Sequence, residues 1–372
     1  MKILLLIQCA NLGGMEQSTL LLMGELKKMG HEVELLSLNE MGPLEPVLRE
    51  RGIPASAVGY RGIWGWRSFF PLRRNLRGRR ADALVMVGHN LMAMLALGDF
   101  CQENRILSMH FHHQNVKSVW GWRLIYWVAM WRFSKIIYPS RFVMDEALAI
   151  VPELAITNRT ISYPIPYPFT MPSQTQNRQR EDFRRQHGLD PEDKVVGNAG
   201  WLIPRKRWDV FLRVAAQVSA AVPRARFIIA GDGPERGNLT RRAAELGIAD
   251  RVIWLGWQKD LESFYRALDV MLFNSDWDAM GRTPLEAMSY GVPVVASMLH
   301  GGLKEALNSE QYGFLTDTHD VPLLAGKVIR FLLDENLAKE TGARARARIE
   351  EIGSPRLHAV RVLKLLAKGT NA

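Results

Sequence analysis

Three consecutive cations, Arg205, Lys206 and Arg207, follow the predicted strand KVVGNAG and open a predicted helix. Positive charge at a helix N-terminus opposes the helix dipole, which favours acids there. An anionic ligand would explain the pattern, because each charge-assisted bond to phosphate contributes about 1.5–3 kcal/mol, against about 0.3–1 kcal/mol for the opposed dipole. A solvated charge run at a helix start is the alternative. The chemistry that these residues indicate is the binding of a diphosphate.

Glycine-containing turns follow several predicted strands and precede predicted helices. Gly14 follows the first strand, Gly231 follows RFIIA, and Gly281 with Arg282 precedes a helix at Thr283. Such turns let backbone N–H groups and a helix N-terminus face an anion. The tight turns that any α/β protein needs are the alternative for each of them. Their recurrence strengthens the prediction of a phosphate site.

Two acidic residues lie in DAMGRTPLEAMSYG, residues 278–291. Asp278 is predicted in a glycine-containing loop, and Glu286 lies eight residues later on a helix that precedes the strand VPVVAS. Carboxylates placed so could bind a ligand. Alternatively, Thr283 is the N-cap of that helix and Glu286 completes a capping box. The stretch alone leaves both possibilities open.

The segment SMHFHHQN contains His110, His112 and His113. No acidic or cysteine motif accompanies them, so we predict no metal site. His110 ends a predicted strand, where its imidazole could hydrogen-bond a substrate hydroxyl. The alternative is a buried histidine whose ring nitrogens are hydrogen-bonded within the protein.

At 372 residues the chain exceeds one ordinary hydrophobic core, so we expect two domains of about 150 to 200 residues. Its composition, 47% hydrophobic and 23% charged, is that of a globular protein. The two cysteines, Cys9 and Cys101, cannot build a disulfide framework, which favours a reducing cytoplasm. No run approaches the roughly 18–20 apolar residues that cross a bilayer.

Short apolar runs alternate with helical patterns within residues 1–170 and again within 171–352, which predicts two doubly wound α/β domains. The proline-rich stretch SYPIPYPFTMPSQTQNRQR is predicted to link them. Residues 353–372 are predicted to form a C-terminal helix that could pack back on the N-terminal domain. Because parallel sheets bind ligands beyond the carboxyl ends of their strands, a cleft between the domains is the predicted site. GxGxxG follows none of the predicted strands, which argues against a dinucleotide-dependent oxidoreductase.

The chain resembles the retaining glycosyltransferases of family 4, which have the GT-B fold of two Rossmann-like domains facing across a cleft. The resemblance covers most of the chain. Supporting segments are GGMEQSTLLLMGELKKMGHEVELLSL, the RKR sequence, FIIAGDGPE and VIWLGWQKDL. The specific segments are DVMLFNSDWDAMGRTPLEAMSYGVPVVAS and the GGLKE that follows it.

The resemblance implies a metal-independent transfer of a sugar from a UDP- or GDP-linked donor, without a further cofactor. It assigns catalytic roles to His110, Lys206, Asp278 and Glu286. The donor sugar is implied to contact His110 and Asp278. The diphosphate is implied to contact Gly14, Arg205, Lys206, Gly281, Arg282 and Thr283. The base and ribose are implied to contact Gly231, Trp257, Gln258 and Glu286, which favours binding over capping for Glu286.

Two residues depart from the family pattern. Asp278 stands where the family has Glu, one methylene longer, so its reach is shorter by roughly 1.5 Å. Trp201 stands where the family has an arginine that contacts phosphate, and Arg205 or Arg207 could substitute for it. Both changes bear on donor choice and activity.

A basic-aromatic segment, residues 61–80, lies in an acid-free region between Glu50 and Asp82. Each basic residue near an anionic bilayer contributes about 1 kcal/mol, and interleaved aromatics suit the interface. We therefore expect peripheral binding to the inner face of the cytoplasmic membrane, and a lipid-linked or membrane-surface acceptor in polysaccharide or glycolipid synthesis. A second aromatic run, VWGWRLIYWVAMWRF at 119–133, is predicted to be a buried helix, with membrane contact as the alternative.

Two rival functions stay open. A sugar-nucleotide epimerase of the same fold would change the donor without an acceptor. A basic nucleic-acid- or membrane-binding module without catalysis is supported by the net charge of +10 and the Arg-aromatic segment. We expect no nucleic-acid partner.

Overall fold

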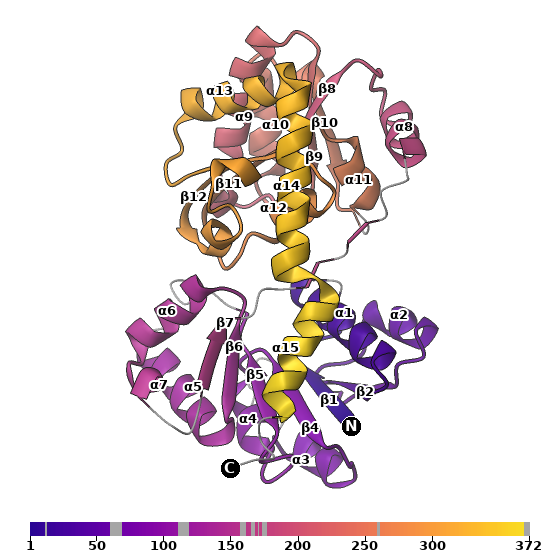
Figure 1. The fold of residues 1–372 in the computed structure, drawn as a ribbon, viewed down its shortest axis with the longest axis vertical. Coiled ribbons are helices and arrows are strands. Elements are labelled where there is room, and N and C mark those ends of the chain that lie inside the picture. The colour runs from indigo at the N-terminus through magenta and orange to yellow at the C-terminus, as the bar shows by residue number, and fades with distance from the viewer. Residues whose placement is uncertain are drawn as a thin grey trace. The chain divides into compact units, whose positions relative to one another are not determined.

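The computed structural model describes residues 1–11, 13–59, 69–110, 119–156, 161–164, 168–169, 171–172, 177–258 and 261–367. The chain divides into two compact units (Figure 1). Unit 1 contains Met1–Pro168 together with Gly353–Ala372, and unit 2 contains Phe169–Ile352.

Unit 1 is built on a parallel sheet with the strand order β3-β2-β1-β4-β5-β6-β7. Its central strands are apolar runs buried along nearly their whole length, as expected of a parallel sheet covered on both faces. The strands are β1 Lys2–Ile7, β2 Glu32–Ser37, β3 Ala55–Ala57, β4 Ala83–Val87, β5 Arg105–Ser108, β6 Lys135–Tyr138 and β7 Ile161–Pro164.

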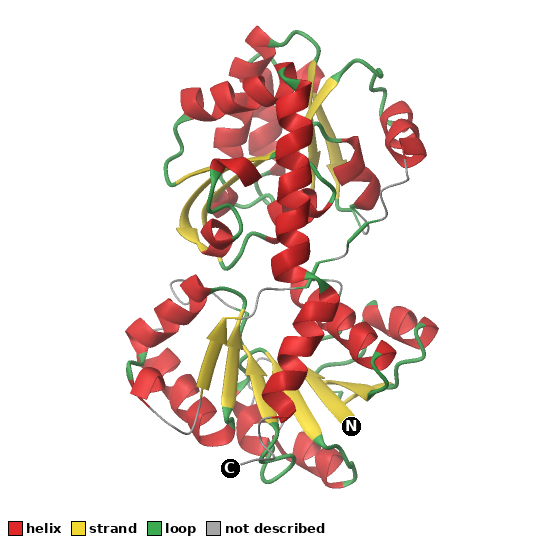
Figure 2. Cartoon of the chain, viewed as in Figure 1, coloured by secondary structure: helices red, strands yellow, loops and turns green. Residues whose placement is uncertain are grey.

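Helices pack around this sheet (Figure 2). They are α1 Gly14–Lys28, α2 Leu44–Glu50, α3 Phe69–Arg77, α4 Leu91–Ala96, α5 Val119–Arg132, α6 Arg141–Ile150, α7 Glu153–Ile156 and α15 Pro355–Ala367. Helix α15, from the far end of the sequence, packs against α1. Its Ala359 and Val362 are fully buried in the same core as Ile3 and Leu5 of β1.

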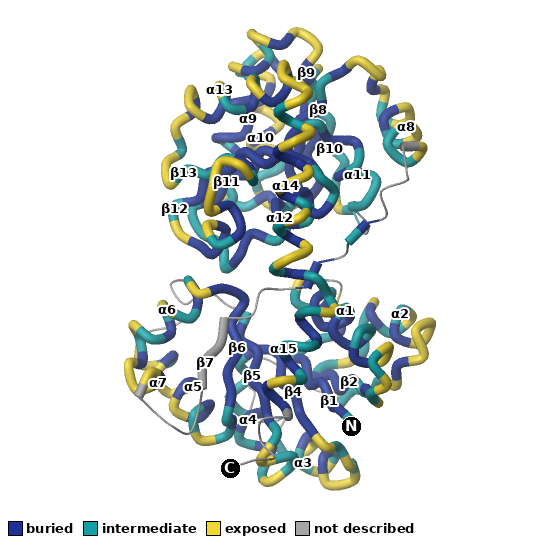
Figure 3. Tube along the Cα trace, in the orientation of Figure 1, coloured by how far each residue is buried: buried dark blue, intermediate teal, exposed yellow. Residues whose placement is uncertain are grey.

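Unit 2 repeats the plan with the strand order β10-β9-β8-β11-β12-β13. Its strands are β8 Lys194–Ala199, β9 Ala225–Ala230, β10 Val252–Gly256, β11 Val270–Asp278, β12 Val294–Gly301 and β13 Phe314–Thr316. Its α-helices are α8 Asn177–Gln186, α9 Trp208–Ala221, α10 Arg236–Glu245, α11 Glu262–Ala267, α12 Arg282–Ser289, α13 Val321–Leu333 and α14 Glu335–Gly353. Short 3₁₀ turns are η3 Pro204–Lys206, η4 Ala249–Arg251, η5 Gly302–Glu305 and η6 Glu310–Tyr312. The buried strands form the interior in Figure 3.

Both sheets confirm the predicted α/β class of two doubly wound domains. In each, the strand order reverses beside one strand: β1 lies between β2 and β4, and β8 lies between β9 and β11. Loops that leave such a switch point on opposite sides create the ligand crevice of open α/β sheets. The relevant loop in unit 2 begins after Ala199 on one side and after Asp278 on the other.

Two local predictions were wrong. Strand β11 continues to Asp278, so this residue ends a strand and does not lie in a loop. The predicted linker also contains regular structure at both ends, because β7 extends to Pro164 and α8 begins at Asn177. Proline content indicated neither the end of this strand nor the start of this helix.

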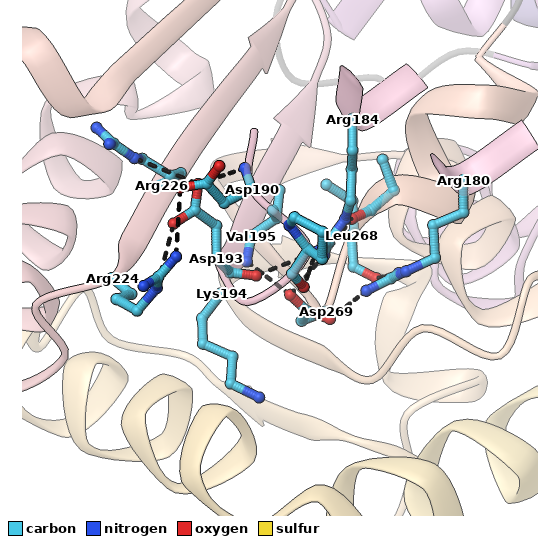
Figure 4. A network of polar contacts seen from close by, with 12 residues as sticks. Arg180, Arg184, Asp190, Asp193, Lys194, Val195, Arg224, Arg226, Leu268 and Asp269 are labelled. Atoms are coloured by element: carbon cyan, nitrogen blue, oxygen red, sulfur yellow. Dashed lines mark hydrogen bonds and ion pairs between the residues drawn. The ribbon is translucent and has the colours of Figure 1, made fainter. Parts of the chain in front are cut away.

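A charged network fixes α8 to the amino ends of the unit 2 strands (Figure 4). Arg184 is buried, and it donates to Asp269 at 2.8 Å and to the carbonyl oxygens of Ala267 and Asp193. Arg180 donates to the other Asp269 oxygen at 2.6 Å. The Asp269 oxygen that Arg184 contacts also accepts from the backbone N–H of Val195. The network therefore ties α8, β8 and the start of β11 together, at the edge opposite the switch-point loops.

Candidate functional site

The cations after β8 lie in a short 3₁₀ turn, η3, and not in the first turn of a helix. Arg207 has a left-handed backbone, with φ of 46°, and ends this turn. Helix α9 then begins at Trp208 and carries Asp209 in its first turn, the charge that a helix dipole favours. The predicted conflict between the cations and the helix dipole is therefore wrong. The turn instead places Arg205 and Lys206 ahead of the helix.

Arg207 is bound by two carboxylates. Its guanidinium donates to Asp209 at 3.0 Å and to Asp276 at 3.1 Å. The hydrogen bond with Asp209, followed by that with Asp276, raises the pKa of Arg207 against the opposing effect of burial. Because Arg207 is held in this way, we expect Arg205, and not Arg207, to substitute for the family arginine at Trp201.

Lys206 and Asp278 form an ion pair across the switch point between β8 and β11. Their side chains are only 14% and 22% exposed. Burial alone would raise the pKa of Asp278, but the charge and hydrogen bond of Lys206, the charge of Arg205 and the backbone amide of Gly281 outweigh it and hold the pKa below its ordinary value. Asp278 is therefore ionised at neutral pH.

Arg205 lies over the neighbouring residue of β11. Its guanidinium carbon is 4.2 Å from the centre of the Trp277 ring, and its Nη1 donates to the Trp277 carbonyl at 3.2 Å. The stacked arrangement holds the long Arg205 side chain beside the Lys206–Asp278 pair. Because the side chain is already ordered, it would lose less conformational entropy when an anion binds.

Glu286 does not complete a capping box, so that alternative is wrong. The N-cap of α12 is Gly281, with φ of 73°, and Thr283 is already the second helical residue. Glu286 lies one turn further on and accepts hydrogen bonds from Tyr265 Oη at 2.7 Å and from Arg282 Nε at 2.6 Å. Tyr265 and Arg282 therefore hold a charged acceptor in a fixed orientation.

Two tryptophans pack on each other at the carboxyl ends of β8 and β10. The ring centres of Trp201 and Trp257 are 5.0 Å apart, and the side chains stay 56% and 53% exposed. Exposed aromatic rings of this kind offer a flat surface to a nucleobase. Gln258 follows Trp257 and donates to the Leu255 carbonyl at 2.9 Å.

Gly231 lies where two loops approach closely after β9. A Cβ atom at this position would lie 1.9 Å from the carbonyl oxygen of Gly200, and the residue has φ of +150°. Its N–H donates to Gly256 at 2.8 Å. Only glycine fits both the backbone angle and the space, so Gly231 joins the loops after β8 and β10.

We expect Gly231→Ala to lower the free energy of unfolding by at least about 2 kcal/mol, because the new methyl group overlaps a backbone oxygen at a strained φ. Urea unfolding of the full chain measures the change. Gly237→Ala is the matched control, since among the described residues no heavy atom beyond its own turn of α10 lies within 4 Å of its added Cβ. Equal midpoints for the two variants would contradict the close approach.

The two predicted site residues of unit 1 also follow strands. Gly14 is the first residue of α1, and its carbonyl accepts from Ser18 Oγ at 2.9 Å. The buried Glu16 already places negative charge in that first turn. His110 Nε2 lies 2.8 Å from Ser108 Oγ and lines a small cavity. His112 and His113 lie outside the described residues.

The structure brings the unit 2 candidates to one edge of the sheet. Lys206, Arg205 and Asp278 are in one cluster, Glu286 and Arg282 are in a second, and Gly231, Trp257 and Gln258 follow the neighbouring strands. Sequence reasoning missed the residues that orient them, Tyr265, Asp276 and Trp277. Tyr265 is 21 residues from Glu286, and no local pattern connects the two. Within the described ranges, no group of three or more His, Cys, Asp or Glu side chains could hold a metal ion.

Comparisons with known proteins agree with this architecture. The family model described as "Glycosyltransferase Family 4" matches residues 12–155, and the model described as "Glycosyl transferases group 1" matches residues 179–348. The first falls in unit 1 and the second in unit 2.

Among curated proteins, the chain is 29% identical over 174 residues to N-acetyl-alpha-D-glucosaminyl L-malate synthase of Bacillus anthracis, covering 47% of this chain and 45% of the relative. It is 33% identical over 168 residues to the lipopolysaccharide core biosynthesis mannosyltransferase LpsB of Rhizobium meliloti, covering 43% and 48%. The chain thus spans less than half the length of these curated relatives.

Among solved structures, the Anabaena protein Alr3699/HepE in complex with UDP superimposes with a TM-score of 0.83. The two chains are 20% identical, and the match covers 99% of this chain and 100% of the other. This similarity extends over both units and shows the fold.

Proposed function

The chain belongs to the family 4 type of glycosyltransferase with the GT-B fold, and on that premise we propose that it transfers a sugar from a nucleotide diphosphate sugar to an acceptor hydroxyl. The observation that carries the proposal is the Lys206–Asp278 pair at the β8/β11 switch point, with Arg205 beside it and Glu286 on the adjoining helix. Cations and a helix N-terminus at such a point suit a diphosphate, and carboxylates suit sugar hydroxyls.

Each part of the donor has a proposed position. Arg205, Lys206 and the N-terminal residues of α12, Gly281, Arg282 and Thr283, bind the diphosphate, with Gly14 contributing from unit 1. Asp278 and His110 bind the transferred sugar, and Glu286 binds the ribose. Gly231, Trp257 and Gln258 hold the base, which is uracil or guanine. The solved complex of the Anabaena protein with UDP supports a uridine nucleotide.

The reaction we propose breaks the bond between the anomeric carbon and the diphosphate oxygen, and forms a bond from that carbon to the acceptor oxygen on the same face. The configuration is therefore retained. The acceptor proton passes to a phosphate oxygen of the departing diphosphate, so no protein base is assigned. Lys206 and Arg205 stabilise the negative charge that develops on the leaving group, a role that needs no metal ion.

The proposed acceptor is lipid-linked or part of a membrane-surface glycan, in the synthesis of a cell-envelope polysaccharide or glycolipid. The curated similarity to a lipopolysaccharide core mannosyltransferase supports it. So does the basic-aromatic segment 61–80, of which residues 69–80 are described: Arg74, Arg77 and Arg80 are exposed, whereas Arg79 is paired with Glu34. The proposed location is the inner face of the cytoplasmic membrane. Within the described residues, no helix is both long and apolar enough to cross a bilayer.

A thermal-shift screen of nucleotides and nucleotide sugars tests the donor proposal. Binding at 100 times Kd stabilises the native state by about 2.7 kcal/mol, so a matching donor raises the melting temperature of the full chain by several degrees. We expect UDP or GDP compounds to raise the melting temperature in this way. Glu286→Gln should raise the apparent Kd of the compound that binds by about tenfold or more. Glu245→Gln, on the exposed surface of α10, is the control. A screen without a hit at millimolar nucleotide would overturn the proposal.

A further inference from the structure

Helix α5 carries a row of large apolar side chains on its outer face. Trp120, Leu124, Trp127 and Trp131 are 76%, 49%, 69% and 65% exposed. Their spacing of four, three and four residues places them on one side of the helix. Residues exposed in this part of unit 1 are drawn in yellow in Figure 3.

The opposite side of α5 belongs to the core of unit 1. Trp122, Ile125, Tyr126 and Ala129 are at most 2% exposed. The sequence prediction of a buried helix at 119–133 is therefore correct for this half of the surface only. Because the inner face anchors the helix, the outer row is not needed for folding, and an apolar patch of this kind marks an interaction surface.

The charges around the row are suited to an anionic partner. The sequence contains no Asp or Glu from Asn104 to Met144. Arg132 lies 3.7 Å from the centre of the Trp131 ring, and Arg123 lies 5.8 Å from that of Trp120. Among the described residues, Glu153 of α7 lies 3.9 Å from Arg123. Burial lowers the pKa of Arg132, and the charge of Asp99 partly offsets that effect.

We propose that this face of α5 docks on the surface of an anionic lipid bilayer, with the helix lying in the plane of the interface. Tryptophan rings concentrate at the level of the lipid headgroups, and arginines extend from there toward the phosphates. A helix that lies in the plane of the interface buries its apolar outer face without crossing the membrane. The tryptophan row supplies apolar insertion, which the arginines of segment 61–80 do not.

The size of the face argues against a second copy of the chain as the occupant. Fourteen residues of helix are about 21 Å long and about 10 Å wide. A standard protein interface buries about 800 Å² on each partner, several times that area. A bilayer does not require a minimum interface area of this kind, and its anionic headgroups can also bind the arginines beside the row.

Co-sedimentation of the full chain with vesicles tests the docking face. We expect binding to phosphatidylglycerol-containing vesicles, weaker binding to phosphatidylcholine alone, and a fraction that persists at about 0.5 M salt, where surface charges are screened within a few ångströms. Vesicles with bromine on the acyl chains should quench part of the tryptophan fluorescence. Trp127→Ala should lower the partition coefficient about tenfold, as expected for roughly 60 Å² of lost apolar burial.

A matched pair of leucines controls for surface apolarity. Leu124→Ser should weaken vesicle binding, whereas Leu333→Ser, which changes a 67% exposed residue of unit 2, should not. Both substitutions are on the surface, so neither should change the melting temperature by more than about 1 °C. The proposal is overturned if the chain does not bind anionic vesicles or if both leucine variants bind them equally. It is also overturned if the chain is a dimer in solution and Trp127→Ala disrupts the dimer without weakening vesicle binding.

The docking face does not rest on the proposed transfer chemistry. Nucleotide-induced thermal shifts measured without vesicles should be the same in Leu124→Ser and in the unaltered chain. A failure of donor binding would leave vesicle binding intact, and a failure of vesicle binding would leave the donor shift intact. The two ideas therefore fail separately.

Discussion

Replacing Lys206 by alanine is expected to lower kcat/KM for the donor at least about 100-fold. Removal of one preorganised group that stabilises developing charge costs about 10²–10³ in rate. In this chain the loss has a second part, because Lys206 is also the ion-pair partner of Asp278. Without the ammonium, a carboxylate that is 22% exposed loses its main opposing charge, and the acid proposed to bind the sugar is misplaced.

Turnover of a donor identified by thermal shift measures this effect. Lys339→Ala, which removes a 78% exposed lysine on α14, is the matched control and should keep normal activity. Lys206→Arg should recover part of the rate, since it restores the charge with a different geometry. Unchanged turnover in Lys206→Ala would falsify the assignment of the diphosphate site.

The effect of Lys206→Ala on stability is expected to depend on pH. The pKa of Asp278 is depressed in the folded chain, so its ion pair contributes stability above the ordinary carboxyl pKa of about 3.9 and loses it as pH falls through the lower folded value. In Lys206→Ala, burial acts without that opposing charge, and the pKa of Asp278 rises. The destabilisation should therefore be larger at pH 7 than at pH 3.

Replacing Arg184 by alanine is expected to lower the free energy of unfolding of unit 2 by about 3–5 kcal/mol, the usual cost of removing one partner of a buried ion pair. Arg184 is 5% exposed, and its donors satisfy carbonyl oxygens of Ala267, Asp193 and Pro191 as well as Asp269. All four acceptors lose a donor at once, in a place that water reaches poorly.

Thermal unfolding of the full chain measures the effect, and hydrogen exchange in β8 and β11 locates it in unit 2. Arg185→Ala is the control on the same helix, because Arg185 is 77% exposed and pairs with Asp182 at the surface. We expect it to change stability by less than about 0.5 kcal/mol. If both variants melt together, α8 is not held by this network.

The fold could be predicted because its signals are local. Apolar runs such as ILLLIQ and KVVGNAG lie on the observed strands β1 and β8, and the repeated strand–helix alternation gave both sheets. The short edge strands were missed, since β3 and β13 each have three residues that are neither buried nor alternating. Asp278 was predicted in a loop because the last three residues of β11, Asp-Trp-Asp, are polar or bulky and only partly buried.

The site could be predicted only in part, for the same reason. Lys206 and Asp278 are 72 residues apart, and only the family resemblance suggested that they act together. The capping-box interpretation of Glu286 failed because Gly281, with its left-handed φ, takes the N-cap position two residues before Thr283. The positions of Gly14 and His110 relative to the unit 2 residues stay a prediction.

Helix α15 gives the chain an unusual order of assembly on the ribosome. The strands of unit 1 emerge first, but residues 355–367, which complete its core, are translated after every residue of unit 2. At about 5–20 residues per second, the nascent sheet waits roughly ten to forty seconds for its last helix. During that interval the apolar face of α1 that α15 later covers is exposed, so the unit that is made first is the last to complete its core.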